Sequence, residues 1–172
     1  KKLLVLCFLI TLSTAYSQQK SVYKEDFNSK GTWPTGSNDI RELNVFNGRY
    51  YFEHKRKEKS WRIVTTDFNL DTSKDFELET SFQKISGVSD YGTCFLYDFK
   101  DGNNYKELAI TSSGHFRVSK NSNGKYTSIK GWTKSSKVKS GNYAVNKLKV
   151  SKKGNTITFY INDANLYSIS YD

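Results

Sequence analysis

Three acidic residues of this 172-residue chain, Asp75, Glu77 and Glu79, stand at alternate positions. In a β-strand, alternate side chains point to the same face, so the three carboxylates would share one face. A retaining glycoside hydrolase needs two carboxylates about 5 to 5.5 Å apart. However, Phe76 and Leu78 fill the intervening positions, as in an ordinary amphipathic strand. Glu77 and Glu79 are therefore candidate catalytic residues, and a solvated strand face is the favoured interpretation.

A second polar cluster, Asp98, Asp101 and Asn103, surrounds Gly102. Carboxylate and amide oxygens beside a glycine turn can hold Ca²⁺. Asp, Asn and Gly are also the residues that tight turns use. Asp98, Asp101 and Asn103 are therefore candidate calcium ligands, with a plain Asp-Gly hairpin loop as the favoured interpretation. No other cofactor is predicted.

The chain is rich in aromatic residues, with 3 Trp, 12 Tyr and 11 Phe. A sugar presents C–H faces between its hydroxyl groups, so flat rings beside a few hydrogen-bonding groups suit carbohydrate. Most of these rings must fill the core. Five stand in or beside predicted loops and are the candidate ligand-binding residues: Trp33, Tyr97, Tyr105, Tyr126 and Trp132.

Other catalytic patterns are missing from the sequence. It contains no Gly-x-Ser-x-Gly elbow, P-loop or dinucleotide fingerprint, and its two histidines, His54 and His115, are expected on the surface. Two cysteines cannot build a disulfide framework. Cys94 is expected to be a small buried side chain, since no histidine lies near it in sequence.

The elements that must position these residues are strands joined by tight turns. Leu43–Phe46 and Arg49–Phe52 flank Asn47-Gly48, a dipeptide that tolerates the positive φ angles of a type I′ turn. Similar turns are expected at residues 101–102, 113–114, 123–124, 153–155 and 162–163. Each of these turns separates two runs of period-two apolar residues, as in a β-hairpin.

Little or no helix is expected, because no segment has a sustained 3.6-residue apolar period with caps. Roughly eleven strands can be counted, which is too many for one flat sheet and suits two packed sheets. Phe76, Leu78, Thr80 and Phe82 should face the core. The prediction is one all-β, two-sheet antiparallel sandwich over residues 22–172.

The first 17 residues have the layout of a secretory signal peptide. Lys1 and Lys2 precede the apolar stretch Leu3–Leu12, and cleavage is expected between Ser17 and Gln18. Cleavage would remove two lysines and no acid, lowering the formal net charge from +10 to +8, and would leave no transmembrane segment. We expect a secreted, periplasmic or cell-surface protein. Its positive charge would then bind acidic polysaccharide or keep the protein soluble. Nucleic acid is not an expected partner.

Several short motifs follow one another in an order that is known from a protein family. They include Asn47–Tyr51, Asp75–Phe82, Ser113–Lys120, Asn146–Val150 and Thr158–Asn162. This order resembles secreted bacterial jelly-roll modules of the concanavalin A-like lectin/glucanase superfamily, with laminin-G-like and family-16-glucanase-like domains as nearer relatives. The signal-peptide exit Tyr16-Ser17-Gln18 resembles that of Bacteroidetes proteins.

The resemblance implies a jelly-roll fold, a lectin-like or glucanase-like activity, and calcium as in laminin-G-like relatives. Glucanases of the superfamily carry a Glu-x-Asp-x-Glu strand, which Asp75, Glu77 and Glu79 match in spacing but not in the order of acids. Family members usually continue for one or two strands beyond the strand at Thr158–Asn162. The domain is therefore expected to be truncated at its C-terminus or to have an open edge.

Together these features predict a non-catalytic binding module that holds a glycan or cell-surface polymer on a sheet face with aromatic residues. Two alternatives stay open: a glycoside hydrolase-like enzyme that uses Glu77 and Glu79, and an accessory domain that binds a protein partner.

Overall fold

The computed structural model describes residues 23–56, 64–65 and 68–171, and within these ranges every helix or strand is a strand. The chain forms two compact units that divide between residues 66 and 67, and each is described by itself. The predicted signal peptide, residues 1–17, lies outside the described residues. The single domain expected over residues 22–172 stays a prediction.

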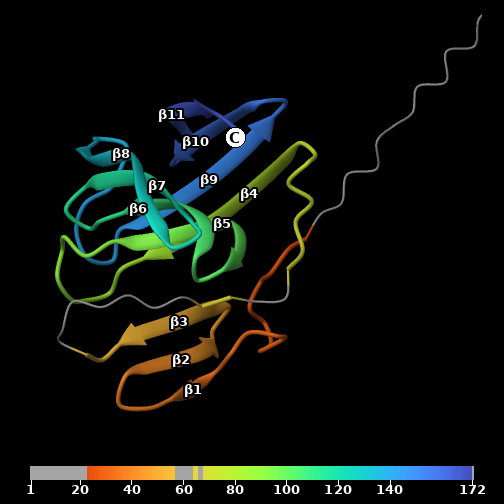
Figure 1. Ribbon diagram of the computed structural model, residues 1–172. Coiled ribbons are helices and arrows are strands. Elements are labelled where there is room, and N and C mark those ends of the chain that lie inside the picture. The colour runs from red at the N-terminus through yellow and green to blue at the C-terminus, as the bar shows by residue number, and fades with distance from the viewer. Residues whose placement is uncertain (1–22, 57–63, 66–67, 172) are drawn as a thin grey trace, which may run out of the picture. The chain divides into compact units, whose positions relative to one another are not determined.

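Unit 1 contains a three-stranded antiparallel sheet in the order β1-β2-β3 (Figure 1). Its strands are β1 (Gly36–Ser37), β2 (Arg41–Phe46) and β3 (Arg49–His54). The predicted hairpin at Asn47-Gly48 is confirmed, with φ angles of 50° and 67° that open a two-residue turn between β2 and β3. Positive φ at both positions matches the right-handed twist of the paired strands.

Unit 2 is a sandwich of two four-stranded antiparallel sheets, in the orders β11-β10-β9-β4 and β5-β6-β7-β8 (Figure 1). Its strands are β4 (Phe76–Gln83), β5 (Thr93–Asp101), β6 (Asn104–Ile110), β7 (His115–Ser122), β8 (Lys125–Lys134), β9 (Val145–Lys153), β10 (Thr156–Ile161) and β11 (Ala164–Ser170). The chain lays down β4, builds the second sheet in sequence order, and returns as β9 beside β4. The predicted all-β, two-sheet antiparallel sandwich is confirmed.

The core of unit 2 lies between the two sheets. Leu148, Val150 and Phe159 of one sheet and Leu108 and Val118 of the other are fully buried. Along β4 the burial alternates as predicted, with the core-facing residues Phe76, Leu78, Thr80 and Phe82 less exposed than the acids between them. Because this alternation buries one face of each sheet, it also decides which side chains point outward.

Candidate functional site

The outer face of the β5–β8 sheet gathers the most distinctive side chains of unit 2. Leu108 of β6 and Val118 of β7 are buried partners in the core, so their neighbours Glu107 and Arg117 point to the other side. Strand pairing places Ala109 opposite Arg117, Glu107 opposite Ser119 and Tyr105 opposite Asn121. We call this surface the aromatic face and define it by its residues: Cys94, Tyr105, Glu107, Arg117, Ser119, Asn121, Tyr126 and Trp132.

Three of the five predicted ligand-binding residues meet on the aromatic face. The Trp132 and Tyr126 side chains are exposed, at 42% and 48%. The Arg117 guanidinium carbon lies 4.6 Å from the Trp132 ring centroid and 5.4 Å from the Tyr126 ring centroid. Tyr126 pairs with Asn121, whose other neighbour is Tyr105. Burial raises the pKa of the half-buried Tyr105 hydroxyl.

Two register shifts between β7 and β8 help to bring these rings together. They lie between Phe116 and Val118 and between Val118 and Ser119, where β8 has extra residues. Bulges of this kind bend a strand and redirect its side chains. As a result, Tyr126 and Trp132, from the two ends of β8, both pack against Arg117.

At the centre of the aromatic face Arg117 and Glu107 form an ion pair of 2.5 Å. The Ser119 hydroxyl donates a hydrogen bond to the same Glu107 oxygen. Glu107 is 5% exposed, and a buried carboxylate is tolerated only where it is paired and hydrogen-bonded. Among the described residues, the shielded Arg117 Nε has no hydrogen-bond acceptor.

Sequence reasoning missed Glu107 and Arg117. The sequence did contain a signal for them. The period-two pattern of Leu108, Phe116 and Val118 places Glu107 and Arg117, which carry opposite charges, on the outward side of two consecutive strands.

Cys94 corrects a prediction, since it is exposed and not buried in the core. It pairs with Ala109 and so lies on the aromatic face. Although part of the residue is open to solvent, desolvation by its neighbours raises the pKa of the thiol to about 12, and the Glu107 carboxylate adds to the rise. The thiol is therefore protonated at neutral pH.

Two predicted ligand-binding residues lie away from the aromatic face. Tyr97 is 2% exposed and packs against Phe159, 5.9 Å between ring centroids, so its assignment to a surface platform is wrong. The reason is that β5 extends past Tyr97 to Asp101, which places Tyr97 on the core side of a strand and not in a loop.

Trp33 belongs to unit 1. Its ring lies 5.2 Å from Phe27 and 4.8 Å from Tyr50, and its indole N–H donates to Glu25 at 3.1 Å. The half-buried ring helps to hold a local aromatic cluster together. An open hollow of about 510 Å³ beside this cluster is lined by residues that include Phe27, Asn44 and Phe46.

Glu77 and Glu79 occupy the solvated face of β4, as the favoured interpretation has it. Glu77 accepts a hydrogen bond from the Ser151 hydroxyl at 3.1 Å, and Glu79 lies 3.8 Å from the Lys147 amine. Both acids are exposed. The side chains that contact these two acids are therefore Ser151 and Lys147 of β9.

In the predicted calcium loop, Asp101 accepts hydrogen bonds from the Asn103 backbone N–H at 2.7 Å and from the Asn104 amide at 3.1 Å. Asp98 instead pairs with Lys106 at 3.4 Å. Within the described ranges, no group of three or more His, Cys, Asp or Glu residues is placed to hold a metal ion. Calcium binding by Asp98, Asp101 and Asn103 stays a prediction.

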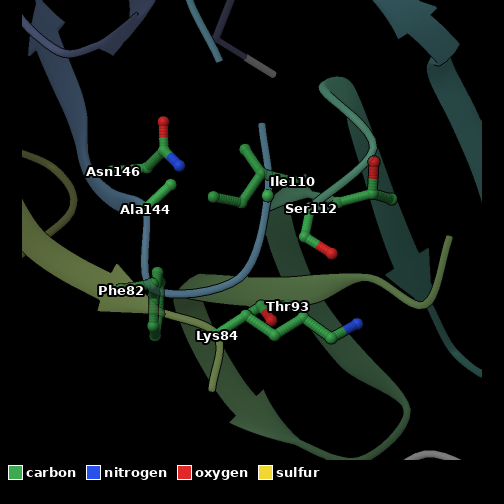
Figure 2. Close-up of a pocket in the computed structure, with 9 residues that line it drawn as sticks. Phe82, Lys84, Thr93, Ile110, Ser112, Ala144 and Asn146 are labelled. Atoms are coloured by element: carbon green, nitrogen blue, oxygen red, sulfur yellow. The ribbon is translucent and has the colours of Figure 1, made fainter. Parts of the chain in front are cut away.

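A small cavity lies at one end of the sandwich (Figure 2). Its volume is about 20 Å³, enough for a water molecule but not for a sugar. It is lined by Phe82, Lys84, Thr93, Ile110, Thr111, Ser112, Gly141, Ala144 and Asn146. None of these residues belongs to the aromatic face.

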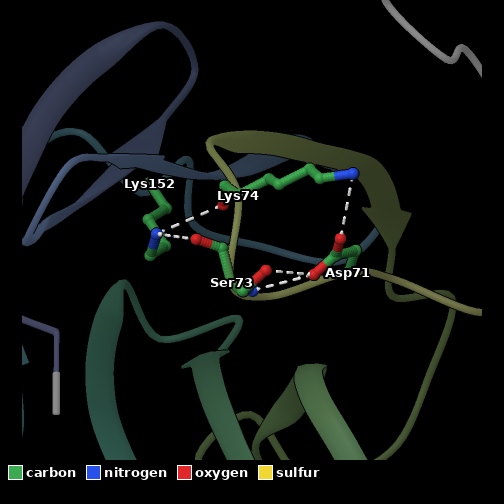
Figure 3. A network of polar contacts seen from close by, with 4 residues as sticks. All are labelled: Asp71, Ser73, Lys74 and Lys152. Carbon is green, nitrogen blue, oxygen red and sulfur yellow. Dashed lines mark hydrogen bonds and ion pairs between the residues drawn. The ribbon is translucent and has the colours of Figure 1, made fainter.

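Several lysine amines donate hydrogen bonds to backbone carbonyls. Lys152 is 6% exposed and donates to the carbonyls of Ser73 and Lys74, at 3.4 and 3.2 Å (Figure 3). The Lys134 amine binds the Ser113 carbonyl. These amines tie loops to the sandwich and do not extend the aromatic face.

Comparison with known proteins gives one structural likeness to report. A solved structure of the carbohydrate binding module CBM66 from Bacillus subtilis is similar to this chain, with 15% sequence identity and a TM-score of 0.52. The match covers 83% of this chain and 76% of that chain. At this identity it shows a shared fold.

No protein-family model and no curated protein matches the chain. In the part of the chain that the structure describes, no helix has the length and apolar character needed to cross a membrane.

Proposed function

We propose that the protein is a non-catalytic carbohydrate-binding module and that the aromatic face is its binding site. One observation carries the proposal: Tyr105, Tyr126 and Trp132 converge on a single sheet face around Arg117 and Glu107. Exposed rings suit the C–H faces of a sugar, and the charged pair and amide beside them suit its hydroxyl groups.

The strands and contacts that hold the aromatic face in place favour ligand binding without structural rearrangement. Its side chains project from four paired strands, and Arg117 is held by Glu107 on one side and by two rings on the others. A rigid, preformed surface loses little conformational entropy when a ligand binds. The shared fold with a carbohydrate binding module agrees with this role.

Binding without catalysis is proposed because the acids that were candidates for catalysis lie on the other sheet. Glu77 and Glu79 neighbour Ser151 and Lys147 there. Secretion or display at the cell surface belongs to the same proposal and is supported by the signal-peptide pattern of residues 1–17.

The test is a glycan array probed with the full chain and with two variants. Trp132→Ala should abolish or strongly weaken the signals, since aromatic anchors contribute most to binding. Tyr160→Ala is the matched control, because Tyr160 is an aromatic residue on the outer side of β10 and contacts Lys149 at 4.6 Å. An array that is blank for the parent chain would reject the proposal in favour of a protein partner.

A further inference from the structure

Among the described residues, the aromatic face has no unpaired charge at its centre, although the whole chain has a formal charge of +10. Arg117 is neutralised where it stands by Glu107 at 2.5 Å. Nearby lysines of the same strands have partners elsewhere. Lys106 pairs with Asp98, and Lys130 lies 5.8 Å from the Tyr167 ring of the opposite sheet. The ion pair therefore leaves no net charge at the centre of the aromatic face.

The Arg117–Glu107 pair offers donors and an acceptor side by side. Arg117 uses one terminal nitrogen for Glu107, and a guanidinium has five N–H donors in a fixed plane. A sugar hydroxyl both accepts and donates, so it can bind such a pair without adding charge. A carboxylate on the ligand would meet an Arg117 charge that Glu107 already compensates at 2.5 Å, so it would gain little from this anchor.

The two exposed rings come from opposite ends of β8, six residues apart, and both contact Arg117. Their centroids lie 4.6 and 5.4 Å from the same Arg117 carbon, so they are no more than 10.0 Å apart, the sum of these distances. Consecutive rings of a polysaccharide can span that separation. Both rings are exposed to solvent, so one polysaccharide chain can contact both of them.

We propose that the ligand is a neutral polysaccharide, bound along its length by at least two consecutive sugar residues, with Arg117 as the polar anchor between the Trp132 and Tyr126 rings. This inference rests on the proposed function and adds the class of carbohydrate and the mode of contact.

The experiment is affinity electrophoresis of the full chain through gels that contain hydroxyethylcellulose, dextran or galactomannan, each beside its carboxymethylated form. We expect a neutral polymer to retard the protein and its carboxymethylated form to retard it less. Raising the salt from about 0.1 M to about 1 M, which shortens the Debye length from about 10 to about 3 Å, should leave the neutral retardation unchanged. An oligosaccharide of the bound polymer should compete at least about tenfold better than its monosaccharide.

Arg117→Lys keeps the charge but loses the planar donors and the ring contacts, so we expect at least about a tenfold loss of affinity. Lys147→Ala, on the opposite sheet, is the control and should change nothing. Since Arg117→Lys can affect folding, its thermal unfolding is compared with that of the parent chain. Tyr126→Ala provides a second variant, which should reduce affinity for the polymer more than for the monosaccharide.

The outcomes separate the two proposals. Stronger retardation by the carboxymethylated polymers, or equal competition by the monosaccharide, overturns this inference and leaves carbohydrate binding intact. The inference is also overturned if none of the polymers retards the protein and the array shows binding to acidic glycans only. Carbohydrate binding would again stay intact. A blank array together with no retardation rejects both.

Discussion

The two outer faces of the unit 2 sandwich are built by the same period-two alternation and differ completely in chemistry. The β5–β8 sheet presents Trp132 and Tyr126 around one ion pair, whose carboxylate is buried. The outer side of the other sheet, which we call the charged face, carries Glu77, Glu79, Lys147, Lys149, Ser151 and Tyr160. These residues form separate pairwise contacts: a hydrogen bond, an ion pair and a cation–π contact. Alternation decides which residues are outside, and cross-strand neighbours decide what those residues can do.

The largest effect is expected from the core that supports both faces. Phe159 is fully buried and contacts Tyr97 of the opposite sheet. Phe159→Ala should lower the free energy of unfolding by about 3 to 5 kcal/mol, because it removes buried surface and leaves a cavity. Urea denaturation measures this change. Phe46→Ala, at a residue that is 67% exposed, should change stability by no more than about 0.5 kcal/mol. Equal effects of the two variants would contradict the described core.

A smaller loss of stability is expected when a glutamate is replaced by glutamine, and its size should differ between the two faces. Glu107→Gln leaves Arg117 without its counter-charge in a site where Glu107 is 5% exposed, and we expect a loss of about 2 kcal/mol or more. Glu79→Gln removes an exposed contact to Lys147 at 3.8 Å and should cost less than about 1 kcal/mol. Thermal and urea unfolding of both variants test the difference. If Glu79→Gln were the more damaging change, the contrast between the faces would be wrong.

The smallest effect concerns a thiol on each face. The raised pKa of Cys94, about 12, means that alkylation should be slow at pH 8 and should accelerate only as the pH approaches that value. The comparison uses Ser81→Cys, on the exposed side of β4, in a chain that carries Cys94→Ser. Cys7→Ser is included in both proteins. The new thiol should react faster at pH 8, and rates measured from pH 7 to pH 10 give both profiles.

The same thiol gives a pH dependence of stability. The folded-state pKa of Cys94 lies above its value in the unfolded chain, so the folded state retains a proton that the unfolded state has lost. The contribution of Cys94 to the free energy of unfolding is therefore fully present below the pKa that the thiol has in the unfolded chain. It declines as the pH rises from that value toward about 12. In Cys94→Ser this part of the decline should disappear. A Cys94 thiol that reacts as fast as the thiol introduced by Ser81→Cys would contradict its environment on the aromatic face.

Local sequence was sufficient for the strands and turns. Asn47-Gly48 and Asn123-Gly124 form the predicted turns because each supplies two residues that accept positive φ. The inward residues of β4 follow from its period, as does the solvated position of Glu77 and Glu79. These features depend on neighbours in sequence, so they can be read without a structure.

The site was predicted less completely. Tyr97 was assigned to a loop because the strand end could not be located beyond it, and one strand position separates the core from the surface. Glu107 and Arg117 were not selected, since their pairing depends on the register between β6 and β7. The position of Trp33 in unit 1 also had no local signal.

Composition, turn residues and period-two patterning by themselves determined that the chain is all-β, where it turns, and which side of each strand is apolar, because these are properties of residues a few positions apart. Only the tertiary structure decided that Tyr105, Tyr126 and Trp132 share one face with Arg117 and Glu107. Their meeting requires a particular strand order and two register shifts in β8, which side chains distant in sequence establish together by packing the core.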